Sequence, residues 1–344
     1  MKIQKRNIIF VAASLILLFV YLWISEGGKG AISSALDALN PLWLLGAMCM
    51  MLLYWLLEAM CLQAVIRRLN PGYPFGRTAY VSMIGQFFNN ITPFASGGQP
   101  MQALYLVHNG LSLGVATSAL LSKFILYQTT LTIYSTIVLI LRYQFLAVHI
   151  SGFGPFILLG YAVSVAVMIG LICICFFQRF THWVVHGTLG LLSRLHIVKR
   201  PEKAFARADQ ELCSFHESFH ILRRHKGMMV EVVLLSFLQL TVYFLIPYFI
   251  CLAFGLFSVS PWAAVSAQSV VLMFSAFIPL PGAMGGAELG FHNLFSTFIP
   301  KAFLSMSILI WRLITFYFPI FIGLLLCLFT RKVKPNDTIP DLIV

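Results

Sequence analysis

Charged side chains are scarce in this sequence of 344 residues. Asp, Glu, Lys and Arg make up 10% of it, whereas a soluble domain carries about 25%. Acidic residues are the scarcest, with 11 Asp and Glu against 23 Lys and Arg, while hydrophobic residues reach 60%. This composition excludes a soluble globular protein and predicts an all-α polytopic membrane protein. The net charge of +12 then points to cytoplasmic loops rather than to nucleic acid, because Lys and Arg gather on that side of a membrane.

Cysteine is also sparse. The seven cysteines are odd in number and lie mostly within apolar stretches, which argues against a disulfide framework. The sequence contains no Walker loop, no dinucleotide-binding fingerprint and no nucleophile elbow. We therefore expect no cofactor, no metal and no catalytic residues, and we favour transport over catalysis.

What the sequence does have is long apolar stretches. Six of them predict full membrane spans, for which about 20 residues are needed: residues 8–23, 42–65, 113–141, 153–177, 228–256 and 302–329. The first follows a basic start but lacks a clear cleavage site, so we interpret it as an uncleaved span. Residues 178–227 form the one sizeable polar region, with nine Lys and Arg and six of the nine histidines. Its pattern predicts amphipathic helices on the membrane surface.

One short pattern occurs twice and interrupts apolar sequence each time. Residues 93–98 and residues 281–286 both read Pro-x-Ala-x-Gly-Gly. Because Pro and paired Gly break helices, each pattern separates two arms, at 78–91 and 100–108 and at 262–277 and 286–298. Each is followed by an apolar helix with one cation, Lys123 or Arg312. Paired interruptions of this kind mark the binding site of many transporters.

The distribution of charge predicts how these segments cross the membrane. If each interrupted segment is a re-entrant hairpin, six spans place eighteen Lys and Arg inside and three outside. The alternative of eight spans gives about ten against eleven, so the positive-inside rule favours the hairpins. The two hairpins then enter from opposite faces, and the repeats at about 78–141 and 262–329 are inverted. Both termini are expected in the cytoplasm.

The breaks also indicate a chemistry. A half-helix that begins after each Gly-Gly presents N–H groups with partial positive charge, which bind phosphate or carboxylate. Lys123 and Arg312 either add charges to such a site or only pair with Glu58 and Glu288, and both alternatives stay open. The residues that we expect to bind substrate are Gln86, Asn90, Pro93, Gly97, Gly98, Lys123, Pro281, Gly282, Gly285, Gly286, Glu288, Arg312 and Glu58.

A different motif would favour an enzyme. His216, Glu217 and His220 form H-E-x-x-H, the pattern of two zinc ligands and a base on one helical face. It lies in the His-rich polar region, where chance matches are easier, and no third-ligand pattern follows. His182 and His186 repeat the spacing. We keep a zinc-dependent membrane enzyme as an alternative function.

The segments around the breaks resemble the signatures of a known family. Residues 85–93 read Gly-Gln-Phe-Phe-Asn-Asn-Ile-Thr-Pro, and residues 279–288 begin Pro-Leu-Pro-Gly and end Gly-Gly-Ala-Glu. Over nearly its whole length the chain resembles the lysylphosphatidylglycerol synthase transmembrane-domain family, which includes the flippase part of the multiple peptide resistance factor proteins. Lys123 stands where family members often have Arg, and Gln99 and Pro100 also differ.

The resemblance implies a membrane lipid translocase in a bacterial plasma membrane, with a part in antimicrobial peptide resistance. It would move a phospholipid such as aminoacylated phosphatidylglycerol, or a polyprenyl-phosphate-linked lipid. The transferase activity of full-length relatives belongs to a soluble domain that we expect to be absent. The expected partners are a lipid with an anionic head group and a separate synthase or cell-envelope enzyme, and a homo-oligomer is compatible with the sequence. A membrane component of lysyltransferase-type lipid modification is an alternative.

Overall fold

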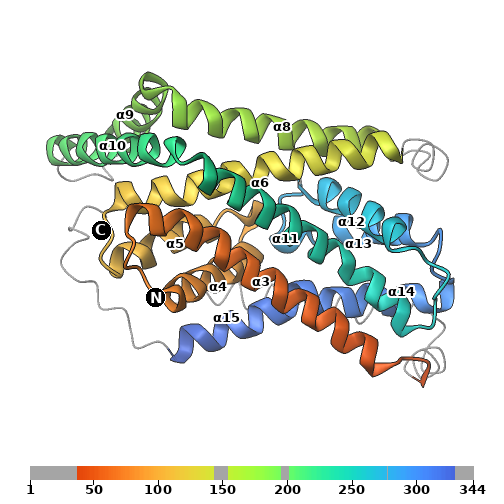
Figure 1. Ribbon diagram of the computed structural model, residues 1–344. Coiled ribbons are helices and arrows are strands. Elements are labelled where there is room, and N and C mark those ends of the chain that lie inside the picture. Colours follow the sequence, from red (N-terminus) through yellow and green to blue (C-terminus); the bar gives the residue numbers. More distant parts are fainter. Residues whose placement is uncertain (1–36, 143–153, 195–200, 277, 330–344) are drawn as a thin grey trace.

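The computed structural model describes residues 37–142, 154–194, 201–276 and 278–329 (Figure 1). All regular elements in these ranges are helical. Five segments are long and apolar enough to cross a membrane: α3 (Pro41–Leu69), α6 (Leu113–Leu141), most of α8 (Gly154–Phe176), α11 (Lys226–Ala253) and the stretch Lys301–Leu328. The prediction of an all-α membrane protein is confirmed. The predicted span at 8–23 and both termini lie outside the described residues.

The outer surface of these helices is apolar. On α3, Leu42, Leu45, Leu52 and Leu56 recur at intervals of three, four and seven residues, and all are exposed. Such a stripe occupies one face of a helix. A contiguous apolar outer face is unfavourable in water and favourable against lipid tails, so the exposed stripe agrees with a membrane setting.

Two pairs of shorter helices carry the repeated pattern. The first pair is α4 (Phe75–Ile91) and α5 (Gly98–His108), joined through the 3₁₀ turn η1 (Pro93–Ala95). The second pair is α12 (Pro261–Ser275) and α13 (Gly286–Phe295), joined through η2 (Pro281–Ala283). At about 1.5 Å per residue each of the four helices is shorter than the roughly 30 Å hydrocarbon core of a bilayer.

The two broken pairs lie toward opposite ends of the helix bundle. In Figure 1, α4 and α5 lie toward the end that carries α9 (Gln178–Arg194) and α10 (Pro201–Arg224), and α12 and α13 lie toward the other end. Their connecting turns η1 and η2 contact each other. Around them, α3 packs along α11, and α15 (Phe318–Phe329) packs along α4.

Several helix starts follow from the sequence directly. Asn40 caps α3 by accepting a hydrogen bond from the Leu42 amide at 3.0 Å, and Pro41 occupies the first turn. Ser112 and Ser260 cap α6 and α12 in the same way. These residue types satisfy N–H groups that a helix leaves without a partner, which is why the predicted start at 113 agrees with the observed one.

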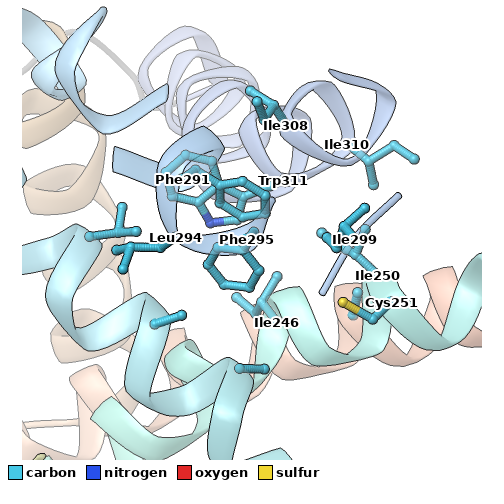
Figure 2. Packing of buried hydrophobic residues seen from close by; sticks show 14 of the residues in the cluster. Ile246, Ile250, Cys251, Phe291, Leu294, Phe295, Ile299, Ile308, Ile310 and Trp311 are labelled. Atoms are coloured by element: carbon cyan, nitrogen blue, oxygen red, sulfur yellow. The ribbon is translucent and has the colours of Figure 1, made fainter. Parts of the chain in front are cut away.

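The second broken pair is anchored in the largest apolar core (Figure 2). The rings of Phe291 and Phe295 on α13 stack with centroids 4.0 Å apart, and Trp311 of α14 (Lys301–Arg312) lies 4.9 Å from Phe291. After Arg312 the helix widens into a π-helical turn, Leu313–Tyr317, before α15 begins. Aromatic packing of this kind contributes beyond its buried area and holds α13 against α14.

Two helices, α9 and α10, occupy the polar region predicted at 178–227. On α9 the side chains of Phe180, Trp183 and Leu191 are exposed, as expected for an amphipathic helix on a membrane surface. On α10 the Glu211 carboxylate accepts a hydrogen bond of 2.7 Å from the Gly114 amide. This contact fastens α10 to the first turn of α6.

Candidate functional site

The two repeated patterns share an unusual backbone conformation. At the second position, Phe94 has φ 52° and Gly282 has φ 60°. At the third position, Ala95 has φ 51° and Ala283 has φ 52°. Left-handed φ is uncommon for residues other than glycine and costs about 1–3 kcal/mol where it occurs. The repeat in sequence is therefore also a repeat in local structure, up to the third residue.

At the first break, two side chains of the preceding segment accept hydrogen bonds from the amides at the start of α5. The amide of Gly97 donates to the Thr92 hydroxyl at 2.8 Å, and the amide of Gly98 donates to the Asn89 side-chain oxygen at 3.0 Å. A β-carbon at Gly98 would lie 2.1 Å from that oxygen. Glycine at this position is thus required by the cap itself. The amides of Gly97 and Gly98 are therefore occupied by side chains of the protein itself.

The second break is held by a cation instead. No side chain of the described residues caps the start of α13. Arg312 Nη1 donates a hydrogen bond of 3.0 Å to the Gly282 carbonyl, and Arg312 Nε lies 2.7 Å from Glu288 Oε1. Glu288 stands in the first turn of α13, where the helix dipole favours a carboxylate. The Arg312 side chain is 5% exposed and that of Glu288 20%.

A second buried ion pair joins α6 to α3. The Lys123 ammonium pairs with Glu58 Oε1, and Gln239 of α11 donates 2.8 Å to Glu58 Oε2. Both charged side chains are at most 10% exposed. A buried charge is tolerated only when paired and hydrogen-bonded, and this pair meets the condition. Each cation that follows a break therefore has a carboxylate partner.

Between the two breaks lies a cavity of about 660 Å³, within the range of about 300–1,000 Å³ that small-ligand sites occupy. Asn89, Asn90 and Phe94 line it from the first break, and Gly282 and Ala283 line it from the second. The remaining wall comes from α6, α8, α11, α12, the start of α13, the end of α14 and the π-helical turn after it. Its polar side chains are those of Tyr127, Gln128, Ser164, Tyr243, Gln268, Arg312 and Thr315.

Apart from Arg312 Nε, which is ion-paired with Glu288, three buried polar atoms of cavity-lining residues lack a hydrogen-bond partner within the described part of the chain. They are Arg312 Nη2, Gln268 Oε1 and Trp311 Nε1. Glu288 Oε2 also lacks one, but Glu288 does not line the cavity. Burying a polar group without a partner costs about 1–3 kcal/mol. A cationic donor and an amide acceptor in the cavity wall are thus available to a bound molecule.

The structure places the predicted site residues in four settings. Asn90, Gly282 and Arg312 line the cavity. Gln86 is not part of the cavity lining, and its amide donates a hydrogen bond of 3.4 Å to the Tyr54 hydroxyl. Pro93, Gly97, Gly98, Pro281, Gly285 and Gly286 shape the two breaks. Glu288 pairs with Arg312, whereas Glu58 and Lys123 form their own pair and do not line the cavity.

Sequence reasoning did not single out Gln128, Tyr243 or Gln268, which line the cavity. Two of these residues could have been identified from the sequence. Gln128 and Gln268 are isolated amides in apolar helices, and polar residues in spans face the bundle interior because lipid exposure is costly. Tyr243 could not, since tyrosine is common in apolar spans.

The H-E-x-x-H motif does not assemble a metal centre. Burial, with a smaller contribution from nearby His182, lowers the pKa of His216, while Arg224 is the main cause of a lowered pKa at His220. Within the described residues, the ligand atoms that converge belong to His182, His186 and Asp209 instead. The zinc-enzyme alternative therefore finds no support in the geometry of this motif.

Two broken helix pairs that meet at one cavity lined by Arg312 define a polytopic α-helical membrane protein with a ligand-sized site. Residues 9–323 match the family model described as "Lysylphosphatidylglycerol synthase TM region", and the chain belongs to this family. It is also similar to a protein described as "UPF0104 membrane protein" from Archaeoglobus fulgidus. The two are 23% identical over 261 residues, which cover 72% of this chain and 74% of the relative.

Proposed function

We propose that this protein is a lipid translocase whose head-group site is the cavity between the two breaks. In this proposal α4–α5 and α12–α13 are re-entrant hairpins that enter the membrane from opposite faces. The observation that carries it is the meeting of η1 and η2 at one cavity that Arg312 lines. Irregular backbone at membrane depth is tolerated where it lines a water-filled cavity, and a site at the interface of inverted repeats is typical of secondary transporters.

The charged groups favour a phospholipid over a neutral lipid. Arg312 still has a donor available at Nη2, and Glu288 has an acceptor available at Oε2. A phosphate matches the first, since guanidinium groups bind phosphate through short charge-assisted hydrogen bonds. An amine matches the second. A head group that carries both, as aminoacylated phosphatidylglycerol does, would use both groups at once.

The first break and Lys123 take indirect parts in this proposal. Because Thr92 and Asn89 already occupy the amides of Gly97 and Gly98, the phosphate is held by Arg312 rather than by the start of α5. The pair of Lys123 and Glu58 fixes α6 against α3. Alternating exposure of the cavity would then come from rocking of one repeat against the other.

Reconstituted vesicles test this function. Purified protein is placed in vesicles with short-chain fluorescent phosphatidylglycerol, lysylphosphatidylglycerol or phosphatidylethanolamine, with diacylglycerol as the phosphate-free control. The double variant Arg312→Gln/Glu288→Gln removes both charges together, so that no unpaired charge is left buried. We expect it to lose about ten- to a hundredfold of the translocation rate, since one charged hydrogen bond contributes about 1.5–3 kcal/mol. Wild-type rates in this variant, or equal transport of diacylglycerol, would contradict the proposal.

A further inference from the structure

The surface helices α9 and α10 bring together three metal-ligating side chains far from the cavity. They form a helical pair at the end of the bundle beyond α8 (Figure 1). His182 and His186 are four residues apart on α9 and therefore face the same side of the helix. Asp209 projects from α10 toward them.

The ligand atoms already converge. His186 Nε2 lies 2.6 Å and His182 Nδ1 lies 3.6 Å from the same oxygen, Asp209 Oδ1. The three residues offer ligand atoms within 4.8 Å of one another. In a tetrahedral site with bonds of about 2.0–2.1 Å, ligand atoms stand about 3.3 Å apart. All three side chains are at least 36% exposed, so small rotations of these side chains suffice to close the difference.

We propose that His182, His186 and Asp209 bind a divalent transition-metal ion of the Zn²⁺ and Co²⁺ type. Two imidazole nitrogens and one carboxylate oxygen suit these ions, whereas Ca²⁺ and Mg²⁺ prefer a shell of oxygens. Exposed ion pairs by themselves contribute about 0–1 kcal/mol. A bound metal ion explains the convergence of three exposed side chains better than their weak ion pairing does.

Neighbouring groups support this site. The ring of Phe205 packs against His186 with centroids 5.1 Å apart and restrains its orientation. His216 lies seven residues after Asp209 on α10, near enough to His182 for their charges to interact. Its side chain is buried, and its Nε2 has no hydrogen-bond partner within the described ranges. His216 itself is outside the group of converging ligand atoms.

The position of the site indicates what the ion would do. α9 continues from α8 after a break at Phe177, whereas α10 is fastened to the first turn of α6 through Glu211 and Gly114. A metal ion shared by α9 and α10 would tie the α8–α9 arm to α6. α8 also provides Ser164 to the cavity wall, so the ion would hold part of that wall in place.

Metal titration of the full-length protein in detergent tests this inference. The protein is purified through an affinity tag that contains no histidine, stripped with a chelator, and titrated with Co²⁺, whose visible absorption reports nitrogen and oxygen coordination; Zn²⁺ is then used as a competitor. We expect one ion per chain. His186→Gln and Asp209→Asn should each weaken binding at least tenfold, because even outer partners of metal ligands contribute about 10–100-fold.

His220→Gln is the matched control. This histidine lies on the same helix and belongs to the H-E-x-x-H motif, but it is outside the convergent group. It should bind the ion as wild type does. A Zn²⁺-dependent rise in the melting temperature, which binding to the folded state produces, should disappear in the double variant His182→Gln/His186→Gln. Stoichiometric binding retained by that double variant, or lost in His220→Gln, would overturn the assignment.

Discussion

The Arg312 side chain binds the backbone of the second break: its Nη1 donates a hydrogen bond of 3.0 Å to the carbonyl oxygen of Gly282. Lys123, the corresponding cation of the first repeat, makes no such contact and pairs with Glu58 of α3. The two cations stand at nearly the same distance after their breaks, yet only Arg312 lines the cavity. The two breaks thus share the backbone conformation of their second and third residues but differ in how their cations are paired.

The shape of the Arg312 side chain leads to the first prediction. A guanidinium reaches Glu288 Oε1 and the Gly282 carbonyl from different nitrogens, whereas a lysine ammonium is a single point charge. Arg312→Lys should therefore lower lipid translocation in vesicles about tenfold, which corresponds to about 1.4 kcal/mol. Arg67→Lys makes the same chemical change at an exposed pair with Glu231 and should leave the rate unchanged. Equal rates in the two variants would contradict this role for Arg312.

Gly282 itself provides a test of the turn. A β-carbon there would lie 2.1 Å from the Phe316 ring, and its φ of +60° is unfavourable for other residues. Gly282→Ala should lower the melting temperature in detergent, with a cost of about 1–3 kcal/mol. Gly170→Ala on α8, where no atom lies within 4 Å of the added carbon, should not lower it, because alanine is the better helix former. If both variants melt like wild type, the turn is not under this constraint.

The pair of Lys123 and Glu58 predicts strong coupling between two substitutions. Lys123→Met alone leaves a buried carboxylate without its charge partner and should cost about 3–5 kcal/mol. Lys123→Met/Glu58→Gln removes both charges and keeps a polar partner for Gln239, so it should be more stable than Lys123→Met. Melting temperatures of the two single variants and the double variant complete the cycle. Additive effects would mean that the pair contributes no mutual stabilisation.

The helices could be predicted from the sequence because their causes are local. The apolar run that begins after Ser112 gives both limits of α6, and the repeated Pro-x-Ala-x-Gly-Gly pattern gives both breaks. The hydrogen bond from the Gly98 amide to the Asn89 side chain joins residues that are nine apart in the sequence. It could not be predicted, because a ligand could accept a hydrogen bond from the same amide equally well. The sequence also did not decide whether Lys123 binds substrate, because its pairing with Glu58 depends on how distant helices pack.

Asn89 allows stability and substrate binding to be separated. Asn89→Ala removes the acceptor for the Gly98 amide and should cost about 0.5–2 kcal/mol, as the loss of a helix cap does. Asn89→Asp keeps an acceptor at the same place, and a negative charge at a helix start is favourable. Its melting temperature should stay close to that of wild type.

The aspartate variant should nevertheless transport differently. Because Asn89 lines the cavity together with Arg312, a carboxylate at this position would repel the anionic head group that Arg312 attracts. Transport of phosphatidylglycerol, with its net negative charge, should fall more than that of zwitterionic phosphatidylethanolamine. Asn293→Asp, on the exposed side of α13, controls for an added charge. If Asn89→Asp lowered the transport of both lipids equally, the cavity would not discriminate between head groups by their charge.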